Sequence, residues 1–548
     1  MPHKATVVVL LVMLMASVGM SACGGTSNVV TTGATAVTTY NADPAVLNII
    51  AGSEQEKILN EIVVPWCRSH KLTCNYTLKG SVDQATLLAA GTSTYDVYWF
   101  ASTVFLQVGD KAGKLQHVKP MFITPLVYAG WKSEMAKLGF VGRDVSISEI
   151  LNAVESGKTT AWLTNPGQSN SGATVFFGFL NYFAGNGPGV ALTMPQLDSA
   201  PVKDGITRFI RAMDQTPPSS GTLMNDCVKN EATCRSLFVY EALVIEKNLE
   251  LTAQGHEPLY VVYPKESLAI ADAPMGFFPH PGVENSRKDQ AFQDLQSYLL
   301  SPEAQQKLVS LGRRPVSSIG LTFDHPDAKV FNQEWGIKAT LRQRPITYPA
   351  ADVIQAALAR YQTSYRRPTH TIYCLDGSGS MASKGWSDLD QASKLIFDQA
   401  IATGYNLQTH PEDVTTVMIF DSAVVGGPWT VEGNDAQKLN GLYDNIHTFK
   451  PQDGTNMYAC LKQAAQLFNQ QANDSHKRLI IVMTDGRSDT DGASEAVGTI
   501  TSMNIPIISI AFGDADPSQL KELADKTRGS VIVNTNLVDA LRQATGYK

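Results

Sequence analysis

Short apolar runs alternate with amphipathic helical segments through residues 370–548. The apolar runs predict strands at Thr371–Leu375, Val414–Phe420, Arg478–Thr484, Ile505–Phe512 and Ser530–Asn534. The segments between them predict helices at Leu389–Ala402, Ala436–Ile446, Met457–Gln470, Ala493–Met503, Pro517–Lys526 and Val538–Ala544. Because the run Leu479–Met483 is almost entirely apolar, we expect helices on both faces of a doubly wound, mostly parallel sheet.

Residues 46–345 show a similar alternation with less regular spacing. The patterns predict strands at Val46–Glu54, Cys74–Lys79 and Tyr95–Phe100, and a helix at Glu56–Cys67. This rhythm predicts an α/β domain over residues 46–345. Within residues 346–369, a helical pattern from Ala350 to Tyr365 is stopped by Pro368, which predicts a linker helix between the two major domains.

The first 22 residues have the features of an export signal. Lys4 precedes an apolar stretch from Ala5 to Val18, and small residues lead up to Cys23. Small residues before a cysteine resemble a bacterial lipobox, which implies a diacylglycerol on Cys23 and anchoring to the outer face of the cell membrane. A plain secretory signal cut nearby is the alternative. The Thr-, Ala- and Gly-rich residues 23–45 should then form a flexible tether.

The cysteines and the charge fit an exported protein. Cys67 and Cys74, and likewise Cys227 and Cys234, are separated by six residues, which predicts two local disulfides. Cys374 and Cys460 lie in apolar contexts and are predicted to be buried free thiols. A net charge of −7 with 17% charged residues leaves no basic surface for nucleic acid.

The most informative motif follows the predicted strand Thr371–Leu375. Asp376, Ser378 and Ser380 occupy alternate positions on a glycine-rich loop, and such hard oxygen ligands suit Mg²⁺. The motif resembles the metal-ion-dependent adhesion site of von Willebrand factor type A domains, whose fold is Rossmann-like. That resemblance implies two further ligands, Thr455 and Asp485, and Mg²⁺ (or Mn²⁺ or Ca²⁺) as the cofactor. It also implies a protein partner that offers an acidic residue to the metal.

The N-terminal α/β segment resembles the extracellular solute-binding proteins of bacterial ABC importers. The resemblance rests on Ile49–Glu54, Tyr95–Trp99, Asn165–Gly172, Val239–Ala242 and Leu299–Gln305. It implies two lobes with a ligand cleft, and the strand-to-helix loops predict an anionic or carboxylate-bearing solute. The candidate contacts are Gly52, Ser53, Ser169, Asn170, Ser171, Gly172 and Tyr240. Helix capping is the alternative role for the Ser and Asn residues.

These patterns predict binding rather than catalysis, because the sequence has neither a GxSxG nor an HExxH motif. We expect an extracytoplasmic, lipid-anchored protein that combines a solute-binding module with a metal-dependent protein-recognition module. The alternative is the substrate receptor of an ABC importer, in which the type A domain is an accessory docking domain. A surface adhesin with a vestigial cleft is a third interpretation.

Overall fold

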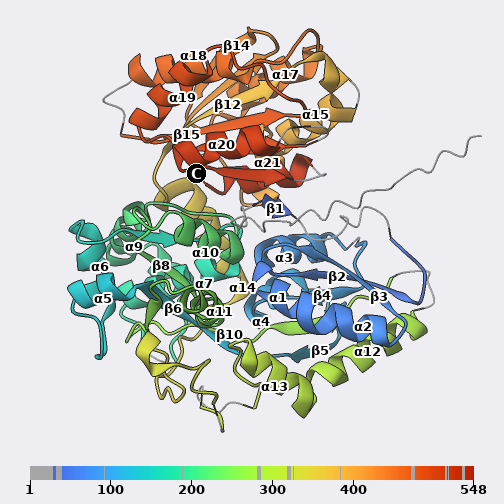
Figure 1. Cartoon of the computed structure of the whole chain (residues 1–548), viewed down its shortest axis with the longest axis vertical. Coiled ribbons are helices and arrows are strands. Elements are labelled where there is room, and N and C mark those ends of the chain that lie inside the picture. Colours follow the sequence, from blue (N-terminus) through green and yellow to red (C-terminus); the bar gives the residue numbers. More distant parts are fainter. Residues whose placement is uncertain are drawn as a thin grey trace, which may run out of the picture.

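The computed structural model describes residues 29–31, 40–91, 93–187, 189–280, 285–317, 322–324, 326–382, 384–470, 475–512, 515, 517–533 and 537–547. In this part of the chain the strands form three sheets, two in the N-terminal lobes and one in the C-terminal domain (Figure 1). The predicted signal peptide and Cys23 lie outside the described residues. None of the described helices has the length and hydrophobicity that crossing a lipid bilayer requires.

The first lobe is built on a five-stranded sheet in the order β3-β2-β4-β11-β5. Its strands are β2 Val46–Ala51, β3 Thr73–Leu78, β4 Val97–Trp99, β5 Gln116–Pro120 and β11 Pro274–Phe277. Its helices include α1 Glu56–Ile58, α2 Val64–Ser69, α3 Ser81–Ala90, α4 Thr103–Gly109, α12 Ser286–Leu299 and α13 Pro302–Ser310. β2, β3 and β4 are parallel, whereas β11 is antiparallel to both of its neighbours.

The second lobe has a sheet in the order β10-β6-β8-β7, with β9 also paired to β6. Its strands are β6 Thr124–Trp131, β7 Ala161–Leu163, β8 Ser236–Tyr240, β9 Leu259–Val262 and β10 Ile270–Ala271. Its helices are α5 Lys132–Lys137, α6 Ile147–Glu155, α7 Asn170–Phe183, α8 Met194–Leu197, α9 Ala200–Ala212, α10 Ser220–Lys229 and α11 Glu241–Ala253. The chain passes between the lobes from β5 to β6 and from β10 to β11, so two segments connect them there.

The linker helix α14 spans Ala351–Arg360 and continues as a π turn over Tyr361–Tyr365. Tyr361 and Tyr365 are buried, and both rings contact Phe176 of α7. The linker therefore packs into the second lobe. At its end the buried Arg366 forms an ion pair with Asp413, which fixes the entry into the C-terminal domain.

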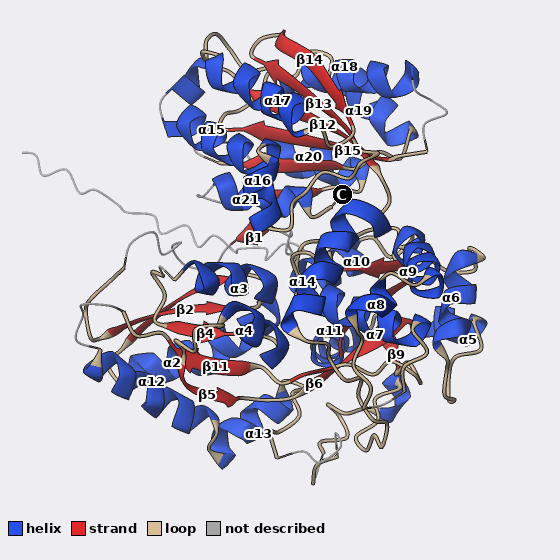
Figure 2. Ribbon diagram, turned by 180° about the vertical axis from the view of Figure 1, so that it is seen from behind, coloured by secondary structure: helices blue, strands red, loops and turns tan. Residues whose placement is uncertain are grey.

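The C-terminal domain is organised around a sheet in the order β1-β17-β16-β15-β12-β13-β14. Its own strands are β12 Thr369–Asp376, β13 Val414–Phe420, β14 Val424–Glu432, β15 Lys477–Thr484, β16 Ile507–Ala511 and β17 Ser530–Val533. Its helices are α15 Lys384–Phe397, α16 Gln399–Gly404, α17 Ala436–Thr448, α18 Met457–Gln470, α19 Ala493–Ser502, α20 Pro517–Thr527 and α21 Leu537–Thr545. Figure 2 shows helices on both faces of this sheet, and a separate apolar core lies under each face. The doubly wound fold is confirmed.

Two strands of this sheet were not predicted. β14 is antiparallel to β13 and forms an edge of the sheet, and its sequence contains Gly426, Gly427 and Pro428, which favour a turn. At the other edge, β1 (Val29–Thr31) pairs in parallel with β17. This short strand lies inside the segment for which the composition predicts a flexible tether.

Three disulfides are present among the described residues. Cys67–Cys74 and Cys227–Cys234 confirm the two predicted local pairs. The third, Cys374–Cys460, shows that the prediction of two free thiols is wrong. Cys374 lies on β12 and Cys460 on α18, and because that helix packs on the same face of the sheet, the two buried side chains meet.

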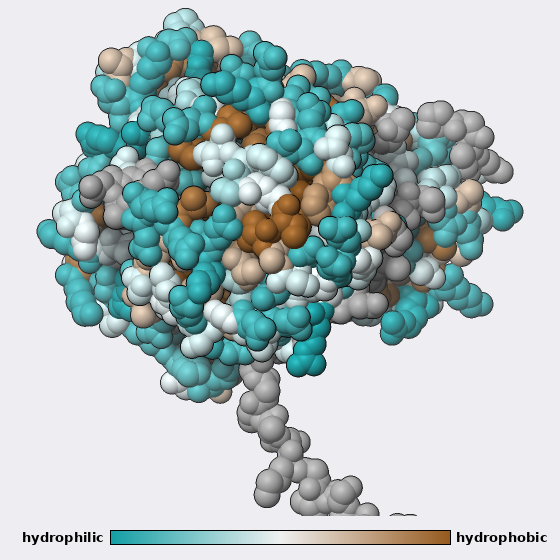
Figure 3. All heavy atoms as spheres, turned by 90° about the horizontal axis from the view of Figure 1, so that it is seen from above, coloured by the Kyte–Doolittle hydropathy of each residue, from teal (hydrophilic) through white to brown (hydrophobic). Residues whose placement is uncertain are grey.

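The C-terminal domain rests on both lobes, with α21 and β1 closest to them (Figure 1). The opposite end of the molecule, seen from above in Figure 3, is mostly hydrophilic with a group of apolar side chains near its centre. This arrangement leaves the outer end of the domain accessible while its inner end contacts the solute-binding lobes.

Candidate functional site

The predicted metal ligands begin where β12 ends. Asp376 is the last residue of this strand and is fully buried, and its Oδ1 accepts a hydrogen bond of 2.9 Å from the backbone N–H of Ser378. β15 runs parallel to β12, with Leu375 opposite Met483, so Asp485 follows its strand at the same edge of the sheet. The strand pairing therefore brings the two carboxylates together, although 108 residues separate Asp376 from Thr484, the last residue of β15.

A chain of short hydrogen bonds joins the ligand set. The Ser378 and Ser380 hydroxyl oxygens are 3.1 Å apart, and the Ser380 hydroxyl donates to Asp485 Oδ1 over 2.6 Å. Ser378 is buried and Ser380 is exposed, so the polar groups run from the interior to the surface. Four of the five predicted ligands are thus directly linked or adjacent.

The fifth predicted ligand, Thr455, lies in the same place. A methyl group built on Gly486 would stand 3.8 Å from both the Thr455 Oγ1 and the Ser380 Oγ, so these hydroxyls flank one point. The Thr455 loop is held next to the Asp376 loop because the Gly379 N–H donates to the Asp453 carbonyl over 3.0 Å. The structure therefore brings all five predicted residues together.

The electrostatics of this site fit a cation. Within the described part of the chain, no lysine or arginine forms an ion pair with Asp376, and its hydrogen-bond partners are the Ser378 amide and the Thr484 hydroxyl. Burial raises the pKa of Asp376, and the nearby Asp485 carboxylate raises it further. A divalent cation would offset both effects, and two carboxylates with three hydroxyls are the hard oxygen donors that Mg²⁺ takes.

Two residues near this site were missed by the sequence analysis. The Thr484 hydroxyl donates to Asp376 Oδ2 over 2.6 Å and so orients the carboxylate. Asp421, which follows β13 as Asp376 ends β12, is buried, and its Oδ2 has no hydrogen-bond partner among the described residues. Both residues stand at the end of a strand that pairs in parallel with β12, and this position could have indicated that they lie near Asp376.

The second candidate site is a cavity of about 140 Å³ between the two lobes. The first lobe contributes Ser53, Glu56 and Asp83 to its wall, and the second lobe contributes Ser219 and Thr222, among others. The lobes touch beside it, because the Ser53 hydroxyl accepts a hydrogen bond of 3.1 Å from the Gly221 N–H. The cavity is therefore closed on the side of this contact.

Of the seven predicted solute contacts, Ser53 lines this cavity and the other six do not. Gly52 precedes it in the chain, and Ser169, Asn170, Ser171, Gly172 and Tyr240 are buried in the second lobe. Asn170 donates to the Tyr240 hydroxyl over 2.7 Å, and the Ser171 hydroxyl lies 2.7 Å from that of Ser220. These hydrogen bonds lie within the second lobe, and the buried Oδ1 of Asn170 has no partner among the described residues.

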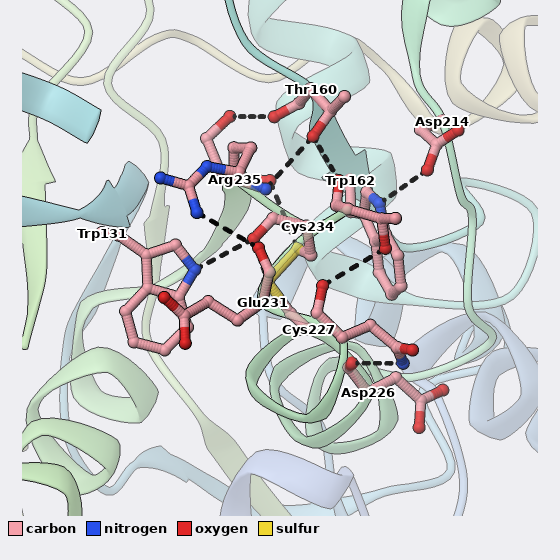
Figure 4. The surroundings of a disulfide bond; sticks show 12 residues. Trp131, Thr160, Trp162, Asp214, Asp226, Cys227, Glu231, Cys234 and Arg235 are labelled. Atoms are coloured by element: carbon pink, nitrogen blue, oxygen red, sulfur yellow. Dashed lines mark hydrogen bonds between the residues drawn. A yellow bond between two sulfur atoms is a disulfide. The ribbon is translucent and has the colours of Figure 1, made fainter. Parts of the chain in front are cut away.

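The helix α10, which carries Thr222, is fixed from behind by the disulfide Cys227–Cys234 (Figure 4). The Cys234 carbonyl accepts a hydrogen bond of 3.0 Å from the Trp131 indole of β6. The disulfide and this hydrogen bond therefore tie the second-lobe wall of the cavity to the central sheet.

Residues 47–314 match the family described as bacterial extracellular solute-binding protein, and residues 372–545 match the von Willebrand factor type A domain. No curated protein matches the chain. A von Willebrand factor type A protein from Catenulispora acidiphila is 20% identical, with a TM-score of 0.29 over 34% of this chain. This chain spans 43% of the length of that protein.

A periplasmic binding protein and a sulfate-binding protein of known structure are similar to part of this chain. One, from Actinobacillus pleuropneumoniae with fructose-6-phosphate bound, is 14% identical and has a TM-score of 0.43, covering 58% of this chain and 98% of its own. The other, a sulfate-binding protein from Mycobacterium tuberculosis, is 14% identical with a TM-score of 0.39, covering 55% and 94%. The chain combines a bacterial extracellular solute-binding domain with a von Willebrand factor type A domain.

Proposed function

We propose that this chain is an extracytoplasmic binding protein, held to the membrane by a lipid on Cys23, with two recognition modules. The solute-binding domain takes a small solute between its lobes. The type A domain engages a protein partner through a divalent cation. The single observation that carries the second role is the buried Asp376 carboxylate, which has hydroxyl and amide partners but no cationic one among the described residues.

In this proposal Mg²⁺ (or Mn²⁺ or Ca²⁺) is held by Asp376, Ser378, Ser380, Thr455 and Asp485. The bound cation would supply an electrophilic position that accepts an acidic oxygen from the partner. Ser380 is exposed and Asp485 is partly exposed, so the outer side of the ligand set faces solvent. Asp376 and Ser378 are buried and hold the inner side in place.

The arrangement favours recognition over hydrolysis. Asp376 accepts hydrogen bonds from the Thr484 hydroxyl and the Ser378 amide, and in this proposal both Asp376 and Asp485 are ligands of the cation rather than general bases. An importer receptor with an accessory type A domain is the second candidate, and the closed cavity between two lobes is the observation that favours it.

The test is native mass spectrometry of the full chain before and after EDTA treatment. We expect one divalent cation per chain, lost on chelation, and an unchanged mass would contradict the metal site. A synthetic peptide with one exposed glutamate should then bind in Mg²⁺ and not in EDTA, and its glutamine counterpart should bind in neither. Equal binding of the two peptides would contradict recognition through an acidic residue.

A further inference from the structure

The cavity between the lobes has a third wall, and this wall belongs to the other domain. Asp539, Arg542 and Gln543 line the cavity together with residues of both lobes. All three lie on α21, which sits against α3 and α10 at the base of the type A domain (Figure 1). A ligand in this cavity would therefore touch both domains.

Two ion pairs hold α21 to the first lobe. The Lys79 ammonium lies 2.5 Å from Asp539 Oδ1, and the Arg542 guanidinium pairs with Asp83. The side chain of Arg542 is 6% exposed and that of Lys79 is 12% exposed, so both pairs are largely shielded from water. Burial raises the pKa of Asp83, and the Arg542 and Lys79 charges oppose that rise.

Hydrogen bonds hold the same region to the second lobe. The Gln168 side chain donates to the Arg542 carbonyl over 2.8 Å, and the Asn165 side chain donates to the Gly546 carbonyl over 2.9 Å. Asp226 of α10 accepts hydrogen bonds from the Ser530 and Tyr547 hydroxyls at 2.9 and 3.2 Å. The type A domain therefore bridges the lobes, and a separation of the lobes would break one of these two sets of contacts.

Most charged side chains around the cavity form ion pairs within the protein. Lys79 is paired with Asp539 and Arg542 with Asp83, so no cationic group on the wall is left for an anion. The half-buried Glu56 carboxylate has no hydrogen bond or ion pair among the described residues. The Nε of Arg542 has no acceptor, but it is buried and out of reach of a solute. One acceptor, the Glu56 carboxylate, is thus available beside the Ser53 and Ser219 hydroxyls.

We propose that α21 is the third wall of the solute pocket, and that this pocket takes a small, uncharged polyhydroxyl solute. Hydroxyl groups both donate and accept, so one molecule can donate to the Glu56 carboxylate and accept from the Ser53 hydroxyl. The volume of about 140 Å³ is close to that of a cavity that holds benzene, so the solute has about six to eight non-hydrogen atoms. The proposed solute class rests on the proposed solute-binding function, whereas the placement of α21 as a wall of the cavity does not.

An uncharged solute differs from the anionic solute that the strand-to-helix loops predict. An anion in the cavity would have to take Lys79 or Arg542 away from its carboxylate, and it would lie close to Glu56. Leaving a shielded carboxylate without its partner costs free energy that an anion must supply before it gains any affinity. A neutral solute has no such cost.

The wall is tested by the accessibility of a thiol placed inside the cavity of the full chain. Thr222→Cys puts the thiol on α10, where Thr222 is 9% exposed. Its reaction with a small methanethiosulfonate reagent is followed by peptide mass mapping, which distinguishes labelling of this thiol from labelling of Cys23. In this background Asp539→Lys sets two ammonium groups against each other, and we expect the reaction to be about tenfold faster.

Two further variants decide the outcome. Lys79→Asp combined with Asp539→Lys restores the pair with reversed charges, and should return the rate to that of the background. Glu495→Lys, which replaces an exposed ion pair with Lys462 on the same domain by two like charges, should leave the rate unchanged. If the thiol reaction were no faster in Asp539→Lys, or as fast in the double variant as in the single one, α21 would not form the third wall of the cavity.

The solute class is tested by calorimetry of the full chain with glycerol and erythritol, and with sulfate and putrescine as charged probes. We expect a polyol to bind, the charged probes not to bind, and Glu56→Gln to weaken polyol binding about tenfold. Binding of sulfate or of putrescine, or of none of the polyols, overturns the solute class. The thiol result is independent of both outcomes, so failure of solute binding and failure of the third wall are distinguishable.

Discussion

The proposed metal loop contains a buried carboxylate and the cavity between the lobes contains partly buried ones, and the protein compensates them differently. In the cavity, Asp83 faces a guanidinium and Asp539 an ammonium. In the metal loop, Asp376 faces hydroxyls and an amide, and the Asp485 carboxylate adds to its negative potential. This difference is the basis for proposing a neutral ligand for the first site and a cation for the second, although both are rich in aspartate.

The charge of a third carboxylate, that of Glu54, is compensated in another way. Glu54, beside the cavity residue Ser53, is buried, and its Oε1 has no hydrogen-bond partner among the described residues. Burial raises its pKa from 4.5 to about 7, with Arg313 opposing the rise. Glu54 is therefore compensated by a proton near neutral pH, where Asp83 uses a basic side chain and Asp376 would use a metal.

The largest expected effect is that of Asp83→Asn. This change leaves the Arg542 guanidinium, whose side chain is 6% exposed, without its carboxylate, and it should cost about 4 kcal/mol of unfolding free energy. Urea denaturation followed by tryptophan fluorescence measures the loss. Glu303→Gln, which removes an exposed pair with Lys307, is the control and should cost less than about 0.5 kcal/mol. Equal losses would mean that the cavity pair is no better shielded than a surface pair.

Glu54→Gln should change how stability depends on pH. Between pH 4.5 and about 7, folded wild type keeps a proton that the unfolded chain loses, so its stability falls as the pH rises through this window. The variant lacks this fall, which amounts to about 3 kcal/mol. Thermal unfolding of both proteins at pH 4, 6 and 8 measures it. Parallel profiles would show that Glu54 is ionised in the folded chain and is compensated like Asp83.

Asp376→Ala should lower the Mg²⁺ affinity more than 100-fold, or about 2.7 kcal/mol, because it removes the inner carboxylate. Calorimetric titration with MgCl₂ checks this. Asp83→Ala is the matched control, since this carboxylate already has a cationic partner and should leave the Mg²⁺ affinity unchanged. If both changes lowered the affinity equally, the proposed distinction between the two carboxylates would fail.

The smallest expected effect is that of Thr484→Val. The variant keeps the shape of the side chain but removes the hydroxyl that donates to Asp376 Oδ2, and should weaken Mg²⁺ binding about tenfold. The same titration measures it. Thr499→Val, which removes a hydroxyl bonded within the exposed surface of α19, should leave the affinity at the wild-type value. A full loss of binding would instead make Thr484 a ligand.

The sequence predicted that Asp376 and Asp485 lie together, because this part of the geometry follows from local rules. Asp376 and Asp485 each follow an apolar run, and parallel strands end at the same edge of a sheet, so their meeting needed no knowledge of tertiary packing. Thr455 was placed by resemblance alone. Thr484 was missed because a threonine at the end of a buried strand is also an ordinary strand residue.

Contacts between distant segments could not be predicted in this way. Cys374 and Cys460 are 86 residues apart, and their apolar surroundings are equally compatible with free thiols. The even number of cysteines after Cys23 was the only hint. Lys79 and Asp539 are separated by 460 residues, and nothing in either local pattern indicates that a helix of one domain closes the cavity of the other. Domain docking depends on surface shape, which periodicity does not encode.

The short strand β1 has a consequence for the position of the protein relative to the membrane. Val29–Thr31 pairs with β17, so the type A sheet is reached six residues after Cys23. An extended chain spans at most about 3.6 Å per residue, so a lipid on Cys23 would hold this edge of the sheet within about 22 Å of the bilayer. A free tether to residue 45 would allow about 80 Å. With such a lipid in place, β1 would shorten the tether, and the type A domain would stand beside the membrane rather than far above it.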